Sequence, residues 1–68
     1  MVYRTSVQTP QQVQALRPKL DQLAGAGNWN FALDDADRIL RIANQVVDPL
    51  QPIRLLHQRG FFCSELED

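Results

Sequence analysis

The stretch that decides the fold is residues 9–23, TPQQVQALRPKLDQL, which contains the start of a helix and its apolar stripe. Thr9 suits the N-cap, Pro10 the first helical position and Gln12 the third, and together they form a capping box. Apolar side chains then recur at steps of three and four residues, at Val13, Leu16, Leu20 and Leu23. This spacing places them on one face, so the sequence predicts an amphipathic helix that begins at Pro10.

Two features shape and end this helix. Pro18 removes the backbone hydrogen bond to Gln14, and we expect a kink within one continuous helix because the apolar stripe stays in register across it. The segment Gly25-Ala26-Gly27-Asn28 is typical of a helix end followed by a turn.

Strand-forming segments lie on both sides of the helix. Their β-branched and aromatic residues predict strands at residues 2–7, 29–33, 38–43 and 61–66. The alternating pattern points five side chains toward the core, namely Trp29, Phe31, Leu33, Leu40 and Ile42. It points Ile39 and Arg41 outward. Tyr3 and Trp29 are predicted to anchor the core with their large rings.

A second helix is predicted after the third strand. It opens at Asp48-Pro49, with Gln51 as the competing N-cap, and Gly60 is the expected residue just beyond its end. The resulting order is βαββαβ. With right-handed crossovers, this order predicts an α+β, ferredoxin-like sandwich: a four-stranded antiparallel sheet with both helices on one face.

The composition limits the class of protein. The chain has 68 residues, 44% hydrophobic and 22% charged, so we expect one globular domain over residues 1–68. A net charge of −1, without a block of Lys or Arg, gives no electrostatic case for binding nucleic acid. No apolar run approaches the ~20 residues that span a bilayer, and Met1-Val2-Tyr3-Arg4 lacks the apolar core of a secretion signal. With its single Cys63, the chain is predicted to be cytoplasmic and to have no membrane partner.

The pattern of helices and glycines resembles the heavy-metal-associated (HMA) domain family over most of the chain. The stripe Val13-x-x-Leu16-x-x-x-Leu20 is similar to the helix that follows the family's metal loop. Gly27 matches the turn before the second strand, and Gly60-Phe61 matches a Gly-aromatic step into the last strand. The resemblance implies the same ferredoxin-like fold.

The resemblance places Thr9 and Gln12 at the two positions where the family has the cysteines of its Cys-x-x-Cys motif. Family members bind soft ions such as Cu(I), or Zn(II), through those thiolates. A hydroxyl and an amide are hard, neutral ligands, so the resemblance implies a degenerate member, and we expect neither metal nor another cofactor. We interpret Thr9–Gln12 as a helix cap, with an anion-binding or partner-binding loop as the alternative.

Other candidate ligands have simpler explanations. Cys63 and His57 do not complete a tetrahedral metal site, and we expect the first in the core and the second at a solvated helix edge. Three aspartates share one turn, Asp34, Asp35 and Asp37. They lack the Gly and the distal Glu of a calcium-binding loop, so we expect a solvated turn.

The sheet face that the helices leave uncovered is the candidate interaction site. This open face is predicted to present Val2, Arg4, Ser6, Asn30, Ala32, Ile39, Arg41, Phe62, Ser64 and Leu66. Its central strands offer no outward aromatic residue on which RNA bases could stack. We therefore expect a protein partner or a second copy to bind there, through Arg4, Ile39, Arg41 and Phe62.

The sequence shows no nucleophile–base pair, metal cluster or phosphate loop, so we expect no enzyme activity. The chain is interpreted as a small non-catalytic binding protein on a metal-carrier-like scaffold. The alternative is a carrier of a metal ion (copper or zinc) or of a small ligand that uses non-standard ligands.

Overall fold

The chain folds in the order βαββαβ in the computed structural model, which describes residues 1–34, 36–43 and 48–66. The six elements are β1 (Val2–Thr5), α1 (Pro10–Ala24), β2 (Trp29–Ala32), β3 (Ile39–Ile42), α2 (Leu50–Gln58) and β4 (Cys63–Leu66). All six appear where the sequence predicts them, and each strand is one or more residues shorter than its prediction.

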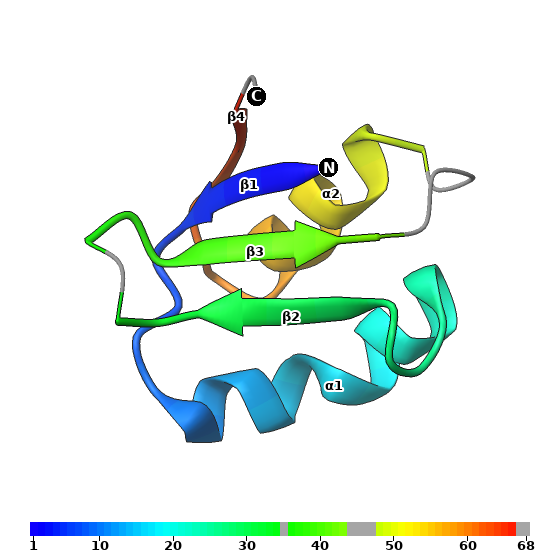
Figure 1. The fold of residues 1–68 in the computed structure, drawn as a ribbon, viewed down its shortest axis with the longest axis horizontal. Helices are drawn as coiled ribbons and strands as arrows, with labels where there is room; N and C mark the ends of the chain where they lie inside the picture. Colours follow the sequence, from blue (N-terminus) through cyan, green and yellow to red (C-terminus); the bar gives the residue numbers. More distant parts are fainter. Residues whose placement is uncertain (35, 44–47, 67–68) are drawn as a thin grey trace.

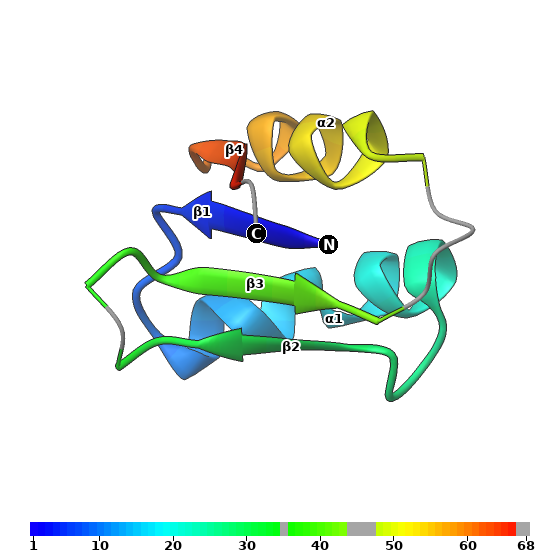
Figure 2. The same ribbon diagram turned by 45° about the horizontal axis from the view of Figure 1, so that its top comes forward.

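The four strands form one sheet in the order β2-β3-β1-β4, with every neighbouring pair antiparallel. Strands β1 and β3 are therefore central, whereas β2 and β4 are the edges. Both helices lie on the same side of this sheet (Figures 1 and 2). The predicted fold class, an α+β sandwich with a four-stranded antiparallel sheet, is confirmed, and the strand order is the one expected for a ferredoxin-like arrangement.

Helix α1 begins with the predicted capping box. The Gln12 N–H donates to the Thr9 hydroxyl at 3.2 Å, and the Gln12 side-chain oxygen accepts from the N–H of Thr9 at 3.3 Å and from that of Gln8 at 2.7 Å. The helix runs without interruption through Pro18, as the continuous stripe predicts. It ends at Gly25, whose φ of 93° suits glycine and whose N–H donates to the Asp21 carbonyl at 2.8 Å.

Helix α2 begins one residue after Pro49. The Asp48 carboxylate accepts from the N–H of Leu50 at 3.0 Å, and the Asp48 carbonyl accepts from the N–H of Gln51 at 3.0 Å. Gln51 lies inside the helix, so the competing N-cap was the wrong choice. The N-cap is Pro49, which makes no side-chain capping hydrogen bond, and the side chain of Asp48, one residue earlier, reaches the free N–H of Leu50.

The end of α2 is a Schellman motif. The Gly60 N–H donates to the His57 carbonyl at 3.0 Å, and the Phe61 N–H donates to the Leu56 carbonyl at 2.9 Å. Gly60 has a φ of 85°, in the left-handed region that favours glycine. The predicted role of Gly60 just beyond the helix is confirmed.

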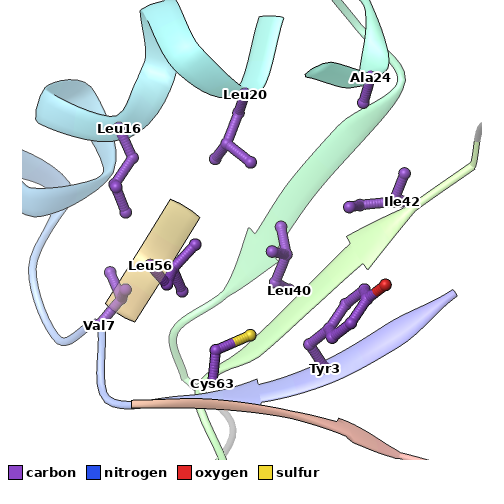
Figure 3. Packing of buried hydrophobic residues seen from close by; sticks show 9 residues of the cluster. All are labelled: Tyr3, Val7, Leu16, Leu20, Ala24, Leu40, Ile42, Leu56 and Cys63. Carbon is purple, nitrogen blue, oxygen red and sulfur yellow. The ribbon is translucent and has the colours of Figure 1, made fainter. Parts of the chain in front are cut away.

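The core lies between the sheet and both helices (Figure 3). Its buried side chains come from every layer: Tyr3, Val7, Leu16, Leu20, Ala24, Leu40, Ile42, Leu56 and Cys63. Tyr3 is the predicted anchor, and its buried hydroxyl donates to the Pro49 carbonyl at 2.9 Å. Burial raises the pKa of the Tyr3 hydroxyl from 10.0 to about 12, with a smaller contribution from nearby acidic groups.

Trp29 and Phe31 were predicted to lie in the core, but they are less buried than predicted. Both side chains point to the helix side, but both are only half-buried and pack at the margin of the cluster. The reason is the position of β2 at the edge of the sheet, where neighbouring side chains cover a residue on one flank only.

Candidate functional site

The strand register determines which residues lie on the open face. Directly paired residues point to the same face of the sheet. The buried pair Tyr3–Leu40 points to the helix side. The pairs Val2–Arg41, Arg4–Ile39 and Asn30–Arg41 point to the other side, which is the open face. The same rule adds Ala32, Ser64 and Leu66. The face is therefore composed as the alternating pattern predicts.

Two arginines give the open face its charge. Arg4 and Arg41 are exposed, and they lie diagonally across the central pair of strands β1 and β3. None of the described strand residues on this face is acidic. Glu65, the acidic residue of β4, pairs with Tyr3 and therefore lies on the helix side. The open face is cationic, although the whole chain carries a net charge of −1.

Ile39 faces outward as predicted, but it is not an accessible contact residue. Only 6% of its surface is exposed. It lies on the central strand β3 between Arg4 of β1 and Ala32 of β2, so neighbouring side chains flank it on both sides. The expectation that Ile39 offers contact area to a partner is therefore corrected.

Phe62 is the accessible apolar residue on this face. It is 52% exposed and lies just before β4, opposite Ser6, which directly follows β1. Its N–H donates to the Ser6 hydroxyl at 2.8 Å, and its carbonyl accepts from the Ser6 N–H at 3.1 Å. Two hydrogen bonds thus hold the backbone of Phe62 while its ring extends into solvent.

The degenerate loop positions Thr9 and Gln12 are both used by the helix cap. The hydroxyl of Thr9 accepts one backbone N–H, and the amide oxygen of Gln12 accepts two. The loop has the geometry of a helix start. Its side-chain oxygens are already engaged in that role.

The remaining candidate metal ligands differ in burial and come from different parts of the fold. Cys63 is buried and points into the core (Figure 3), where burial raises the pKa of its thiol from 9.0 to about 11. His57 is exposed in the last turn of α2, and Asp34 and Asp37 are exposed in the turn between β2 and β3. Asp35 lies outside the described residues. Among the residues that the structure describes, no three His, Cys, Asp or Glu side chains group as a metal site does.

The structure shows one feature that sequence reasoning missed, a polar and aromatic cluster around Trp29. The indole N–H donates to the Asp21 carboxylate at 2.8 Å, and the Arg17 guanidinium lies 5.5 Å from the ring centre. Phe31 meets the ring edge-on, with 6.0 Å between centroids. The available signal was the pair Arg17 and Asp21, four residues apart on one side of α1.

Trp29 borders two hollows. The first, of about 350 Å³, is the α1–β2 groove, lined by Pro10, Val13, Gln14, Arg17, Gly27, Trp29, Asn30, Phe31 and Leu33. The second, of about 360 Å³, lies at the end of the sheet between the start of β1 and the end of β3. The exposed part of the Trp29 ring is therefore available to a ligand in either hollow.

Comparison of the chain with protein-family models, curated proteins and solved structures finds no match. The resemblance to HMA domains therefore stays a prediction. Within residues 1–34, 36–43 and 48–66, neither helix is long and apolar enough to cross a lipid bilayer.

Proposed function

We propose that this chain is a non-catalytic, cytoplasmic protein-recognition domain that binds an acidic surface of a partner protein through its open face. The observation that carries this proposal is the charge of that face. Arg4 and Arg41 are exposed on the two central strands, and no described strand residue on the face is acidic. A cationic platform attracts carboxylates and speeds their encounter with it.

Phe62 supports the same function. Phe62 is an exposed aromatic side chain on the same face as Arg4 and Arg41, and aromatic residues and arginine are both enriched in protein interfaces. The fixed backbone of Phe62 lowers the entropy lost when its ring is buried by a partner. Arginine guanidinium groups bind carboxylates through paired hydrogen bonds, which gives such contacts a defined geometry.

The experiment compares partner capture by charge-reversed variants. The double variant Arg4→Glu/Arg41→Glu reverses the open face, and Lys19→Glu/Arg54→Glu makes the same change of net charge at exposed helix positions. Proteins cross-linked to the wild-type chain in cells should also be captured by the helix variant and lost from the open-face variant. Raising the salt concentration should weaken the capture of the same proteins.

Two outcomes contradict the proposal. One is capture of the same proteins by the open-face variant and the wild type. The other is self-association of the wild-type chain in sedimentation that is abolished by Arg4→Glu/Arg41→Glu, because it would assign the face to a second copy.

A further inference from the structure

The free edge of β2 presents backbone groups to solvent. The Ala43 N–H donates to the Asn28 carbonyl at 2.7 Å. This bond shows which residues of β2 direct their backbone N–H and C=O groups toward β3. Because bonding residues alternate along an antiparallel strand, Asn30 and Ala32 bond to β3. The N–H and C=O groups of Trp29 and Phe31 therefore point away from the sheet.

Nothing in the sequence of this edge blocks another strand. Edge strands are commonly protected by a charged residue or a proline. Strand β2, Trp-Asn-Phe-Ala, has neither. In the described part of the chain, no further strand pairs with its outer side.

The α1–β2 groove lies beside this edge. Strand side chains alternate between the two faces, so every second side chain of an added strand would lie toward the groove. About half of the groove wall is apolar, and this part is formed by Val13, Phe31 and Leu33 together with Pro10 and the ring of Trp29. It is therefore suited to apolar side chains from that strand.

Arg17 is the one charged residue among the described residues that line the groove. Its Nε donates to the Gln14 side-chain oxygen at 3.1 Å, and its guanidinium is held over the indole ring of Trp29. Held in this way, the terminal nitrogens present the paired donors that a carboxylate accepts. The Asp21 carboxylate accepts from the indole N–H, so a partner carboxylate is disfavoured at that edge of the ring.

We propose that the edge of β2 and the α1–β2 groove form a strand-addition site for an extended segment of a partner protein. The segment pairs its backbone with Trp29 and Phe31, inserts an apolar side chain into the groove and places an Asp or Glu side chain against Arg17. This site shares Asn30 with the open face but none of Arg4, Arg41 and Phe62, and it does not depend on the function proposed there.

The test is a selection from a displayed library of random peptides about eight residues long, enough to extend past the four residues of β2. Wild-type protein is the bait, and Arg17→Glu is used for counter-selection. We expect enriched peptides with Asp or Glu and apolar residues at alternating positions. Trp29 is the single tryptophan, so its fluorescence reports the binding of synthetic copies directly.

Three protein variants and a set of N-methylated peptides distinguish strand addition from simple charge attraction. Arg17→Glu should bind the peptides roughly tenfold more weakly. Arg54→Glu makes the same change of charge at an exposed position of α2. This variant and Arg4→Glu/Arg41→Glu should bind the peptides as the wild type does. Peptides N-methylated at the positions that face β2 should lose binding, whereas methylation at the intervening positions should preserve it.

The proposal is overturned by a selection that enriches no peptide above uncoated beads, or by peptides that bind Arg17→Glu and the wild type equally. It is also overturned if bound peptide slows amide hydrogen exchange at β4 and leaves Trp29 and Phe31 unchanged. A wild-type dimer in sedimentation, with the Trp29 and Phe31 amides protected before any peptide is added, would assign the edge to a second copy instead.

Discussion

The two edges of the sheet differ in what they offer a partner. Strand β4, Cys-Ser-Glu-Leu, carries the exposed charge of Glu65 and packs against α2. Strand β2 carries no charge and lies beside a groove with two half-buried aromatic rings. Charge on an edge opposes the approach of another strand, whereas apolar side chains beside free backbone groups favour it. The difference indicates that only β2 is suited to strand addition.

The largest effect on stability is expected from a substitution in the core, which supports both edges of the sheet. Leu20 is fully buried between the helices and the sheet, and Leu20→Ala should lower the free energy of unfolding by about 2–5 kcal/mol. Urea denaturation measures this change, with Leu50→Ala as the control because Leu50 is 51% exposed. Equal stability of the Leu20 variant and the wild type would show that the core is placed wrongly.

Alkaline pH should lower the free energy of unfolding, first through ionisation of Cys63 in β4. The pKa of the Cys63 thiol is raised from 9.0 to about 11 by burial, so above pH 9 the unfolded chain loses this proton while the folded protein keeps it. The free energy of unfolding should therefore be unchanged below pH 9 and fall as pH rises toward 11, by at most about 1.4 kcal/mol per pH unit.

Urea denaturation between pH 8 and pH 10 in a reducing buffer tests this slope, which spans the ordinary pKa of the thiol. The variant Cys63→Ala should lack the contribution of the thiol. Tyr3 adds a second loss above pH 10 because its pKa is raised from 10.0 to about 12. A wild type and a Cys63→Ala variant with the same slope below pH 10 would refute the buried thiol.

A smaller effect is expected at the β2 edge. Trp29→Phe keeps an aromatic ring but removes the hydrogen bond from the indole N–H to Asp21. Because Trp29 is half-buried at the margin of the core, the loss should be about 0.5–1.5 kcal/mol of unfolding free energy. The double-mutant cycle with Asp21→Ala isolates this bond, and strictly additive effects of the two changes would contradict it.

The smallest effect is expected from Glu65→Gln, which removes the charge of the β4 edge. Glu65 is exposed, so the free energy of unfolding should change by no more than about 0.5 kcal/mol. Chemical denaturation and peptide binding at β2 should both resemble the wild type. A gain of peptide binding at β4 in this variant would show that Glu65 alone distinguishes the two edges.

The local parts of the fold were predictable from the sequence. Thr9, Pro10 and Gln12 determine the start of α1 through short-range hydrogen bonds, and Gly60 determines the end of α2 through its positive φ. These features depend on residues within a few positions of one another. The alternation along the strands also placed the outward-facing residues of the open face correctly.

Burial within the sheet was less predictable, because it depends on strand order. Trp29 and Ile39 both follow the alternating pattern, yet Trp29 is only half-buried on an edge strand and Ile39 is buried on a central one. The α1–β2 groove likewise requires the relative placement of α1 and β2. A pattern of period two shows which face a side chain occupies, but not how many neighbours cover it.

The most direct test of the difference between the edges is amide hydrogen exchange along β2 in the free protein. The Asn30 N–H points toward β3, whereas those of Trp29 and Phe31 point to the free edge. At a concentration where the chain is monomeric, we predict slow exchange at Asn30 and fast exchange at Trp29 and Phe31. Protection of Trp29 and Phe31 equal to that of Asn30 would show that the edge is already covered and would contradict the account.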